Sequence, residues 1–292
     1  MNSADSLSAF KPAIILSHVQ IKPLLAARRA GARTASLSPD LNLTTVTVQL
    51  SEMGVRFPGG EWLPWDDAEQ IAQAEVGCFV LEAEGVRKVS AFSEVTGRYC
   101  SLMPTEGAPT LLVAGFPMHR IKGTDPHRDT LSKIKAAAPA GLVLDTSMGL
   151  GYTAIEAARR AERVITIEID PAVVEVASYN PWSRELFCSA KIERHLGDSF
   201  DRVRTFDYNL FTCIIHDPPT FSLAGDLYSA AYYRELYRIL KRGGRLFHYI
   251  GDLDSPSGQQ VARGVIRRLS EAGFQTIARH KEAFGIVGIK RW

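Results

Sequence analysis

Four acidic residues stand at the ends of apolar, β-prone segments after residue 140 of the 292-residue chain. Asp145 ends the run LVLD, Glu168 ends ITIE, Asp198 follows KIERHL after one glycine, and Asp217 follows FTCIIH. Ligands of open α/β sheets bind at the carboxyl ends of the strands. Carboxylates there accept hydrogen bonds from hydroxyl and amino groups and favour cations, so we expect the four acids to share one ligand with these groups.

A glycine turn follows the first of these acids in the segment LVLDTSMGLGYTAIEAA. Gly149 and Gly151 can adopt positive φ and let a ligand approach the backbone closely. The helix expected after them begins with N–H groups that have no partner within the helix. Asp145 places a negative charge beside this turn, which disfavours a pyrophosphate and favours a ligand with an ammonium group.

A second loop, HDPPTF, follows the strand candidate FTCII. Pro218 and Pro219 stiffen this loop and remove two N–H donors. The carboxylate of Asp217 and the carbonyls near Pro218 would then accept hydrogen bonds from an amino group and aim its lone pair. His216 is a second candidate for removing a proton.

The elements that must position these residues alternate between strands and helices after His119. Strands are expected at 142–145, 163–170, 191–196, 211–217 and 245–252, with helices between them. Two further strand candidates, QTIARHK and FGIVGIKR, are too close in sequence for a helix between them. The sequence therefore predicts an α/β, Rossmann-like fold, with a mostly parallel seven-stranded sheet whose last strand is antiparallel.

The first part of the chain has a different texture. We expect an N-terminal segment with a short helix at 1–34, a small β-rich domain for substrate recognition at 35–120, and a cofactor-binding domain at 121–292. Basic and aromatic side chains in the β-rich part could bind a nucleic acid by charge and stacking. They are Arg56, Arg87, Lys88 and Arg98 with Phe57, Trp62, Trp65 and Tyr99.

The composition favours an ordinary globular protein. The 34 basic and 32 acidic residues give a net charge of +2, which supplies no strong field to steer a polyanion. The four cysteines form no C-x-x-C pair, so we expect neither a metal site nor a disulfide framework, and the cytoplasm is the expected compartment. No apolar run reaches the ~18 residues of a membrane helix.

The four acidic elements, in this order, resemble the class I S-adenosylmethionine-dependent methyltransferases. In that family the first acid and the glycines hold the methionine end of S-adenosylmethionine, the second acid the ribose and the third acid the adenine, and the D-P-P loop lies beside the transferred methyl. The resemblance implies cofactor contacts at Asp145, Ser147, Gly149, Gly151, Glu168, Asp198, Asp217 and Pro218.

The same resemblance implies that Asp217 and His216 carry the chemistry and that Pro219, Thr220 and Phe221 face the acceptor. The DPPTF loop is similar to that of a group of predicted archaeal and bacterial methyltransferases. The expected acceptor is a nitrogen of an RNA base or a small molecule. No membrane partner is expected, and the oligomeric state stays open.

Two other enzyme classes fit parts of the pattern. Gly149-x-Gly151-x-x-Ala154 with Glu168 matches a dinucleotide-binding fingerprint, but Asp145 and the D-P-P loop have no role in hydride transfer. An aminopropyltransferase of the spermidine synthase type has the same fold and uses decarboxylated S-adenosylmethionine. Such enzymes favour three glycines where this chain has SMG, and paired acids where it has HDPP. These departures make aminopropyl transfer the alternative rather than the first expectation.

Overall fold

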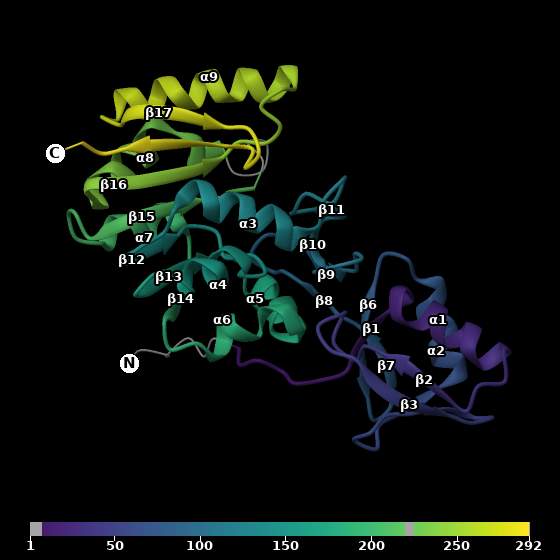
Figure 1. Ribbon diagram of the computed structural model, residues 1–292. Coiled ribbons are helices and arrows are strands. Elements are labelled where there is room, and N and C mark those ends of the chain that lie inside the picture. Colours follow the sequence, from purple (N-terminus) through teal and green to yellow (C-terminus); the bar gives the residue numbers. More distant parts are fainter. Residues whose placement is uncertain (1–7, 220–224, 292) are drawn as a thin grey trace. The chain divides into compact units, whose positions relative to one another are not determined.

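The computed structural model describes residues 8–219 and 225–291 (Figure 1). The described chain forms two compact units. The sheet unit contains residues 128–170, 189–219 and 225–291, and the N-terminal unit contains residues 8–127 and 171–188. None of the helices in the described ranges combines the length and the apolar character that a membrane crossing requires.

The sheet unit is built on one seven-stranded sheet with the strand order β14-β13-β12-β15-β16-β18-β17. The first five strands in this order run parallel, whereas β18 is antiparallel to both of its neighbours. This confirms the expected Rossmann-like fold. The strands are β12 (Leu142–Asp145), β13 (Arg163–Glu168), β14 (Ile192–Leu196), β15 (Phe211–His216), β16 (Leu240–Tyr249), β17 (Gln275–His280) and β18 (Gly285–Ile289).

The strand order reverses at β12. The chain runs outward from β12 to β13 and β14, and then returns to pair β15 with the other side of β12. Asp145 therefore lies in register with Thr166 of β13 on one side and Ile215 of β15 on the other. This reversal is the point at which ligands bind in open α/β sheets.

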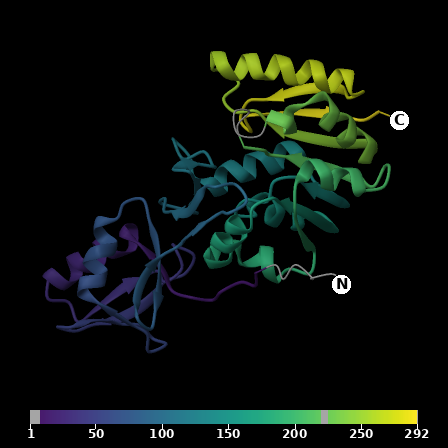
Figure 2. The same ribbon diagram turned by 180° about the vertical axis from the view of Figure 1, so that it is seen from behind.

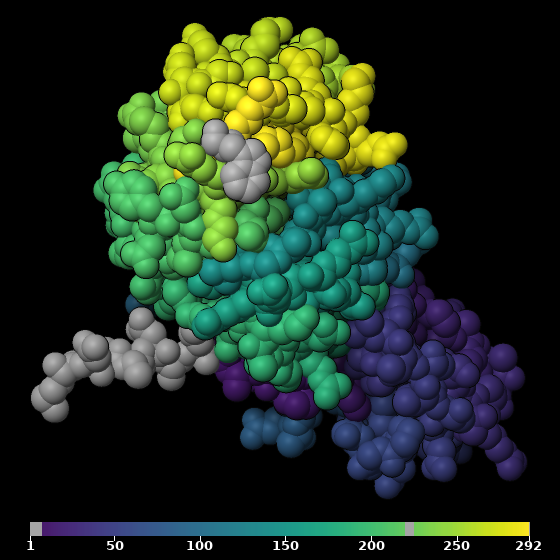
Figure 3. Space-filling view, turned by 60° about the vertical axis from the view of Figure 1, so that its left-hand side comes forward, coloured from purple at the N-terminus to yellow at the C-terminus, as the bar shows by residue number. Residues whose placement is uncertain are grey.

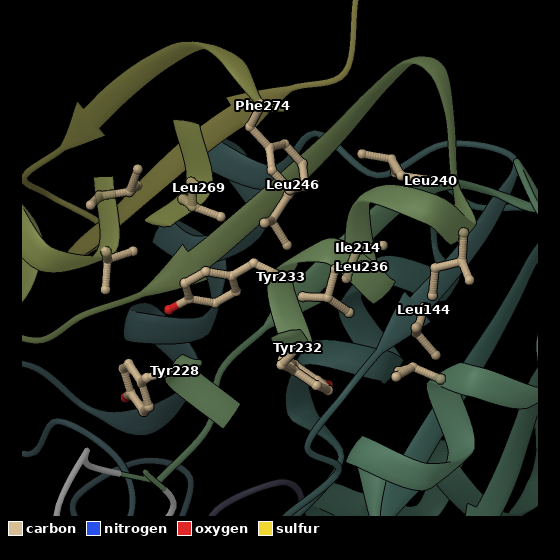
Figure 4. Close-up of a cluster of buried hydrophobic side chains, with 14 of the residues drawn as sticks. Leu144, Ile214, Tyr228, Tyr232, Tyr233, Leu236, Leu240, Leu246, Leu269 and Phe274 are labelled. Carbon is tan, nitrogen blue, oxygen red and sulfur yellow. The ribbon is translucent and has the colours of Figure 1, made fainter. Parts of the chain in front are cut away.

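One face of the sheet is covered by α7 (Ser199–Thr205), α8 (Ala230–Ile239) and α9 (Pro256–Glu271). Leu144, Ile214 and Leu246 lie in register on three neighbouring strands and meet the buried side chains of α8 and α9 (Figure 4). On the other face, Cys213 and Arg245 reach backbone carbonyls of α3 (Pro126–Ala137). The sheet is thus packed on both sides, which leaves its carboxyl edge as the place for a ligand.

Helix α8 ends earlier than its sequence suggests. The sequence pattern predicts a helix over 228–241 that is closed by Gly243 and Gly244. In the structure, strand β16 already begins at Leu240. Leu240 pairs with Phe211, and the N–H of Gly243 donates to the carbonyl of Lys290. These sheet hydrogen bonds override the local helix pattern. At the far edge of the sheet, β17 is partly exposed, and the C-terminal part of the chain lies at the surface in Figure 3 (yellow).

The N-terminal unit contains three small antiparallel sheets, with strand orders β1-β6-β7, β2-β3-β4-β5 and β11-β10-β9-β8 (Figure 2). The expected β-rich character is therefore confirmed. The strands are β1 (Ile15–Ser17), β2 (Thr34–Leu37), β3 (Val46–Leu50), β4 (Gly54–Arg56), β5 (Trp62–Pro64), β6 (Cys78–Glu82), β7 (Gly85–Lys88), β8 (Ser90–Phe92), β9 (Tyr99–Met103), β10 (Thr110–Val113) and β11 (Phe116–Pro117).

The helices of this unit include one that the sequence analysis did not predict, α2 (Trp65–Gln73). The others are α1 (His18–Arg29), α5 (Pro171–Tyr179), η1 (Pro181–Ser183), α6 (Arg184–Cys188) and the first residues of α3. Leu16 and Ile21 share one core with Leu37 and Val48. The described part of the expected segment 1–34 thus packs with the β-rich part in a single unit.

Candidate functional site

Asp145 is fully buried at the end of β12. Its Oδ2 accepts hydrogen bonds from the hydroxyls of Thr153, at 3.1 Å, and Thr166, at 2.9 Å. Its Oδ1 has no hydrogen-bond partner among the described residues, although the Ser147 N–H is near enough to favour the charged form. Burial raises the pKa of Asp145 to about 7, because the hydroxyls offset only part of the cost of burying the charge.

The glycine turn after Asp145 begins with two backbone hydrogen bonds, from Met148 N to the Ile167 carbonyl and from Gly151 N to the Met148 carbonyl. Gly149 and Gly151 both adopt the left-handed conformation, with φ of 53° and 78°. A Cβ added to Gly149 would meet no atom within 4 Å among the described residues. The turn therefore borders open space that a ligand can enter.

Glu168 stands beside this turn at the end of β13. Its Oε2 accepts from the N–H of Gly149 at 2.9 Å, and its Oε1 accepts from the N–H of Asp170 at 3.0 Å. Burial raises the pKa of Glu168 to about 7 despite these two hydrogen bonds. The structure thus brings Glu168 into contact with the same glycine turn that follows Asp145.

Asp198 lies one strand further along the same edge of the sheet. The N–H of Gly197 donates to the carbonyl of Glu168 at 2.7 Å, which ties the two strand ends together. The Asp198 side chain is exposed and caps α7 by accepting from the N–H of Phe200 at 2.7 Å. A helix cap has a structural function, but the exposed carboxylate still has acceptor capacity for a ligand.

Asp217, on the other side of β12, has a partner that the sequence analysis missed. Its Oδ2 accepts from Nζ of Lys133, at 2.6 Å, and Lys133 also lies 3.0 Å from Oδ2 of Asp129. Burial raises the pKa of Asp217, while the Lys133 charge opposes this rise. Burial alone would lower the pKa of Lys133, but Asp217 and Asp129 raise it instead. The lysine therefore carries a full charge.

His216 is fully enclosed next to Asp217. Its Nε2 donates to the carbonyl of Leu227 at 3.0 Å, so its Nδ1 is the acceptor for the Thr146 hydroxyl at 2.7 Å. Burial lowers the pKa of His216 to about 3. A neutral imidazole with both nitrogens occupied and no exposed surface is poorly suited to remove a proton, so this geometry favours a structural role for His216.

The loop after β15 contacts η2 (Gly225–Tyr228). The hydroxyl of Tyr228 donates to the carbonyl of Pro219 at 3.1 Å, and Arg268 donates to the backbone carbonyl of Tyr228 at 2.8 Å. Thr220 and Phe221, the expected substrate contacts, lie outside the described residues. The described part of the D-P-P loop is therefore fixed by Lys133 at one end and by Tyr228 at the other.

The aromatic and basic residues expected to bind a nucleic acid are not all available for it. Phe57 and Trp65 are buried in the core of the N-terminal unit. Arg87 is engaged by Glu82 and Tyr179, while Tyr99 is exposed. The described residues also contain no group of three or more metal-ligating side chains placed to hold an ion.

Part of the chain matches a known protein family, and most of it matches a known protein. Residues 144–248, which include the end of β12 with Asp145 and the D-P-P loop, match a family described as methyltransferase domain. Over 261 residues the sequence is 42% identical to "Uncharacterized protein MJ1233" of Methanocaldococcus jannaschii, covering 87% of this chain and 88% of that protein.

Two further matches are a polyamine aminopropyltransferase and a spermidine synthase. "Polyamine aminopropyltransferase 2" of Streptomyces coelicolor is 28% identical over 146 residues, which cover 47% of this chain and 26% of that protein. The crystal structure of spermidine synthase from Thermotoga maritima superposes with a TM-score of 0.55 and 18% identity, covering 70% of this chain and 72% of that one. At this identity the superposition shows a shared fold.

Residues 144–248 match a methyltransferase domain and lie on a Rossmann-like sheet, which is the arrangement of the class I S-adenosylmethionine-dependent methyltransferases. The cofactor of such a domain is S-adenosylmethionine. Within that class, the chain belongs to the same family as MJ1233 of Methanocaldococcus jannaschii.

Proposed function

We propose that the chain transfers the methyl group of S-adenosylmethionine to the nitrogen of an amino group on a small molecule. Asp145 and the turn at Ser147, Gly149 and Gly151 would hold the methionine end of the cofactor. Glu168 would accept from the ribose hydroxyls and Asp198 from the adenine amino group. Asp217 and the carbonyl of Pro218 would face the methyl group and the acceptor.

One observation carries the proposal. The buried Oδ1 of Asp145 has no hydrogen-bond partner among the described residues, and it belongs to a carboxylate that sits at the reversal of the strand order beside an open glycine turn. A buried acceptor without a partner carries a free-energy cost of about 1–3 kcal/mol or more. An ammonium group bound at the turn would supply the missing donor, so the residues present fit this cofactor.

The chemistry needed from the protein is modest. The cofactor supplies an activated methyl group on a positively charged sulfur. The protein must align the acceptor nitrogen with that methyl and exclude water. Asp217 would accept a hydrogen bond from an acceptor N–H and thereby direct the nitrogen lone pair towards the methyl.

A small amine is favoured over RNA as the acceptor. Two of the four aromatic residues that could stack on bases are buried. The described site has acidic residues at 145, 168, 198 and 217, and this concentration of carboxylates disfavours the phosphates of RNA. A tritiated methyl group should therefore appear in the small-molecule fraction of a cell extract, whereas label that is released by ribonuclease would instead identify RNA as the acceptor.

Calorimetry with three ligands tests the cofactor site. S-adenosylmethionine should bind the wild-type chain, and Asp145→Asn should weaken this binding by about tenfold or more because one charge-assisted hydrogen bond is worth about 1.5–3 kcal/mol. Asp207→Asn, at an exposed position, is the matched control. Binding of NAD in preference to S-adenosylmethionine would refute the proposal.

Aminopropyl transfer is the second candidate. The similarity to an aminopropyltransferase and the surplus of carboxylates in the site support it, because decarboxylated S-adenosylmethionine has lost its carboxylate and carries two positive charges. Under this alternative, the decarboxylated compound should bind at least tenfold more tightly than S-adenosylmethionine, and putrescine should be converted to a longer polyamine. The methyltransferase proposal predicts the reverse order of affinities.

A further inference from the structure

The buried ion pairs around Lys133 form a chain of three charged groups. Lys133 is only 2% exposed, and its Nζ lies between Oδ2 of Asp217, at 2.6 Å, and Oδ2 of Asp129, at 3.0 Å. Asp129 and Lys133 are four residues apart on α3, so they share one face of that helix. The ring of Tyr249, at the end of β16, lies 4.3 Å from the same ammonium group.

Such an arrangement is costly to build. Each buried ion loses its hydration, and the pairing recovers this cost only when the geometry is close. An apolar side chain at position 133 would avoid the cost and fill the same space. The row of buried charged groups ends at Asp217, beside the reversal of the strand order. This position points to a functional role for the ion pairs in the site.

The contact leaves the two oxygens of Asp217 in different states. Oδ2 is occupied by Lys133, whereas Oδ1 makes no hydrogen bond within the described residues. Without the lysine, burial and the neighbouring Asp145 would favour protonation of Asp217. A protonated carboxyl donates through its O–H group, so it would no longer offer two acceptor oxygens to an amino group.

We infer that Lys133, which also pairs with Asp129, is a positioning residue that keeps Asp217 negatively charged and oriented so that Oδ1 stays available to the acceptor nitrogen. This inference rests on the proposed function, because it assigns Asp217 to the acceptor. Lys133 itself contacts neither the acceptor nor the methyl group in this scheme.

The charge state of Asp217 can be measured without knowing the acceptor. Carbon-13 NMR of aspartate-labelled protein follows each carboxyl during a pH titration, and Asp217→Asn assigns the signal. Lys133→Met should raise the pKa of Asp217 by about one unit or more, while Lys133→Arg should restore it. The titratable and charged groups that face Asp217 from the packed elements are Asp129, Lys133, Asp145, Tyr228 and Tyr249.

Asp129→Asn provides a second variant with the opposite sign. It leaves Lys133 in place and removes a negative charge near Asp217, so the pKa of Asp217 should fall. It keeps the inference testable if Lys133→Met does not fold. An unchanged pKa of Asp217 in a folded Lys133→Met protein, or in Asp129→Asn, would overturn the inference.

Turnover gives the second readout, measured as transfer of tritiated methyl from S-adenosylmethionine to the unlabelled small-molecule fraction. Lys133→Met should lower kcat by about 100-fold while the Kd for S-adenosylmethionine stays within about twofold, because only the acceptor side is misaligned. Lys135→Met, at an exposed position of the same helix, should behave as the wild type. A loss of thermal stability with unchanged kcat would mean that Lys133 is merely structural.

The two readouts separate the inference from the function on which it rests. If the wild-type chain fails to bind S-adenosylmethionine, the proposed function is wrong, whatever the titration shows. If it binds and methylates while the pKa of Asp217 ignores Lys133, the function stands and the role of Lys133 is refuted.

Discussion

At the scale of single residues, two aspartates at neighbouring strand ends differ in their partners. Asp145 accepts from two hydroxyls and lies near the Ser147 N–H, and burial raises its pKa to about 7. Asp217 meets the ammonium group of Lys133. The first carboxylate therefore lacks a cation that a ligand can bring, and the second already has one. This difference fits the proposed roles, in which Asp145 holds the cofactor and Asp217 orients the acceptor.

The role of Asp217 can be tested by truncation. Asp217→Ala should reduce kcat by about 10²–10⁴-fold, because the acceptor nitrogen loses the group that orients it. The Kd for S-adenosylmethionine, measured by calorimetry, should change by less than about threefold, since Asp145 and Glu168 remain. Asp226→Ala, at an exposed position, serves as control, and turnover that survives the Asp217 change would contradict the assigned role.

At the scale of elements, the position of the loop after β15 depends on hydrogen bonds that involve η2 and α9. The hydroxyl of Tyr228, in η2, donates to the carbonyl of Pro219, and Arg268, in α9, donates to the backbone of Tyr228. A chain of hydrogen bonds thus links α9 to the D-P-P loop. Two prolines stiffen the loop internally, and these hydrogen bonds fix one side of it.

Removal of the Tyr228 hydroxyl should loosen this loop. Tyr228→Phe should lower the free energy of unfolding by about 1 kcal/mol, the usual net contribution of one hydrogen bond, and should lower kcat more than it changes the Kd for S-adenosylmethionine. Denaturant titration and turnover measure the two effects. Tyr208→Phe, on an exposed tyrosine, should change neither.

The final hairpin depends on a close approach between β18 and β16. A Cβ at Gly285 would lie 2.5 Å from the ring of Phe247 and 2.8 Å from the backbone carbonyl of His248. Gly285→Ala should therefore cost about 1–3 kcal/mol of stability through overpacking, which would be visible as a lower Tm. Gly225→Ala is the control, because its added Cβ would meet no described atom within 4 Å.

At the scale of the whole molecule, two enclosed carboxylates couple folding to pH. Burial raises the pKa values of Asp145 and Glu168 to about 7, from ordinary values of 3.8 and 4.5. The folded chain therefore binds these protons more tightly than the unfolded chain does. Their contribution to stability is complete below pH 4 and is lost as the pH rises through 7.

Comparison with Asp145→Asn isolates this effect. As the pH rises from 4 to 8 without ligand, the wild type should lose up to about 4 kcal/mol of unfolding free energy relative to the variant, since one pKa unit corresponds to about 1.4 kcal/mol. Denaturant titrations across this range measure the difference. Saturating S-adenosylmethionine should reduce it, and a difference that does not vary with pH would show that Asp145 is already fully charged.

Much of the fold could be predicted from local patterns. The alternation of strands and helices, the closing hairpin and the acids at strand ends depend on residues near one another in sequence. The end of α8 could not be predicted, because Leu240 joins the sheet by pairing with Phe211, which is distant in sequence. Helix α2 was not predicted, because the segment before it is rich in turn residues. Its apolar face is buried only when it packs against the core of the N-terminal unit.

By itself, the sequence determined which residue types stand at the ends of strands, and therefore the class of ligand they suit. Only the tertiary structure decided the environment of each side chain. Lys133 meets Asp217 across 84 positions of sequence, and His216 becomes inaccessible because Thr146 and Leu227 occupy its two nitrogens. Charge state and accessibility depend on burial and on partners, which the order of residues along the chain does not contain.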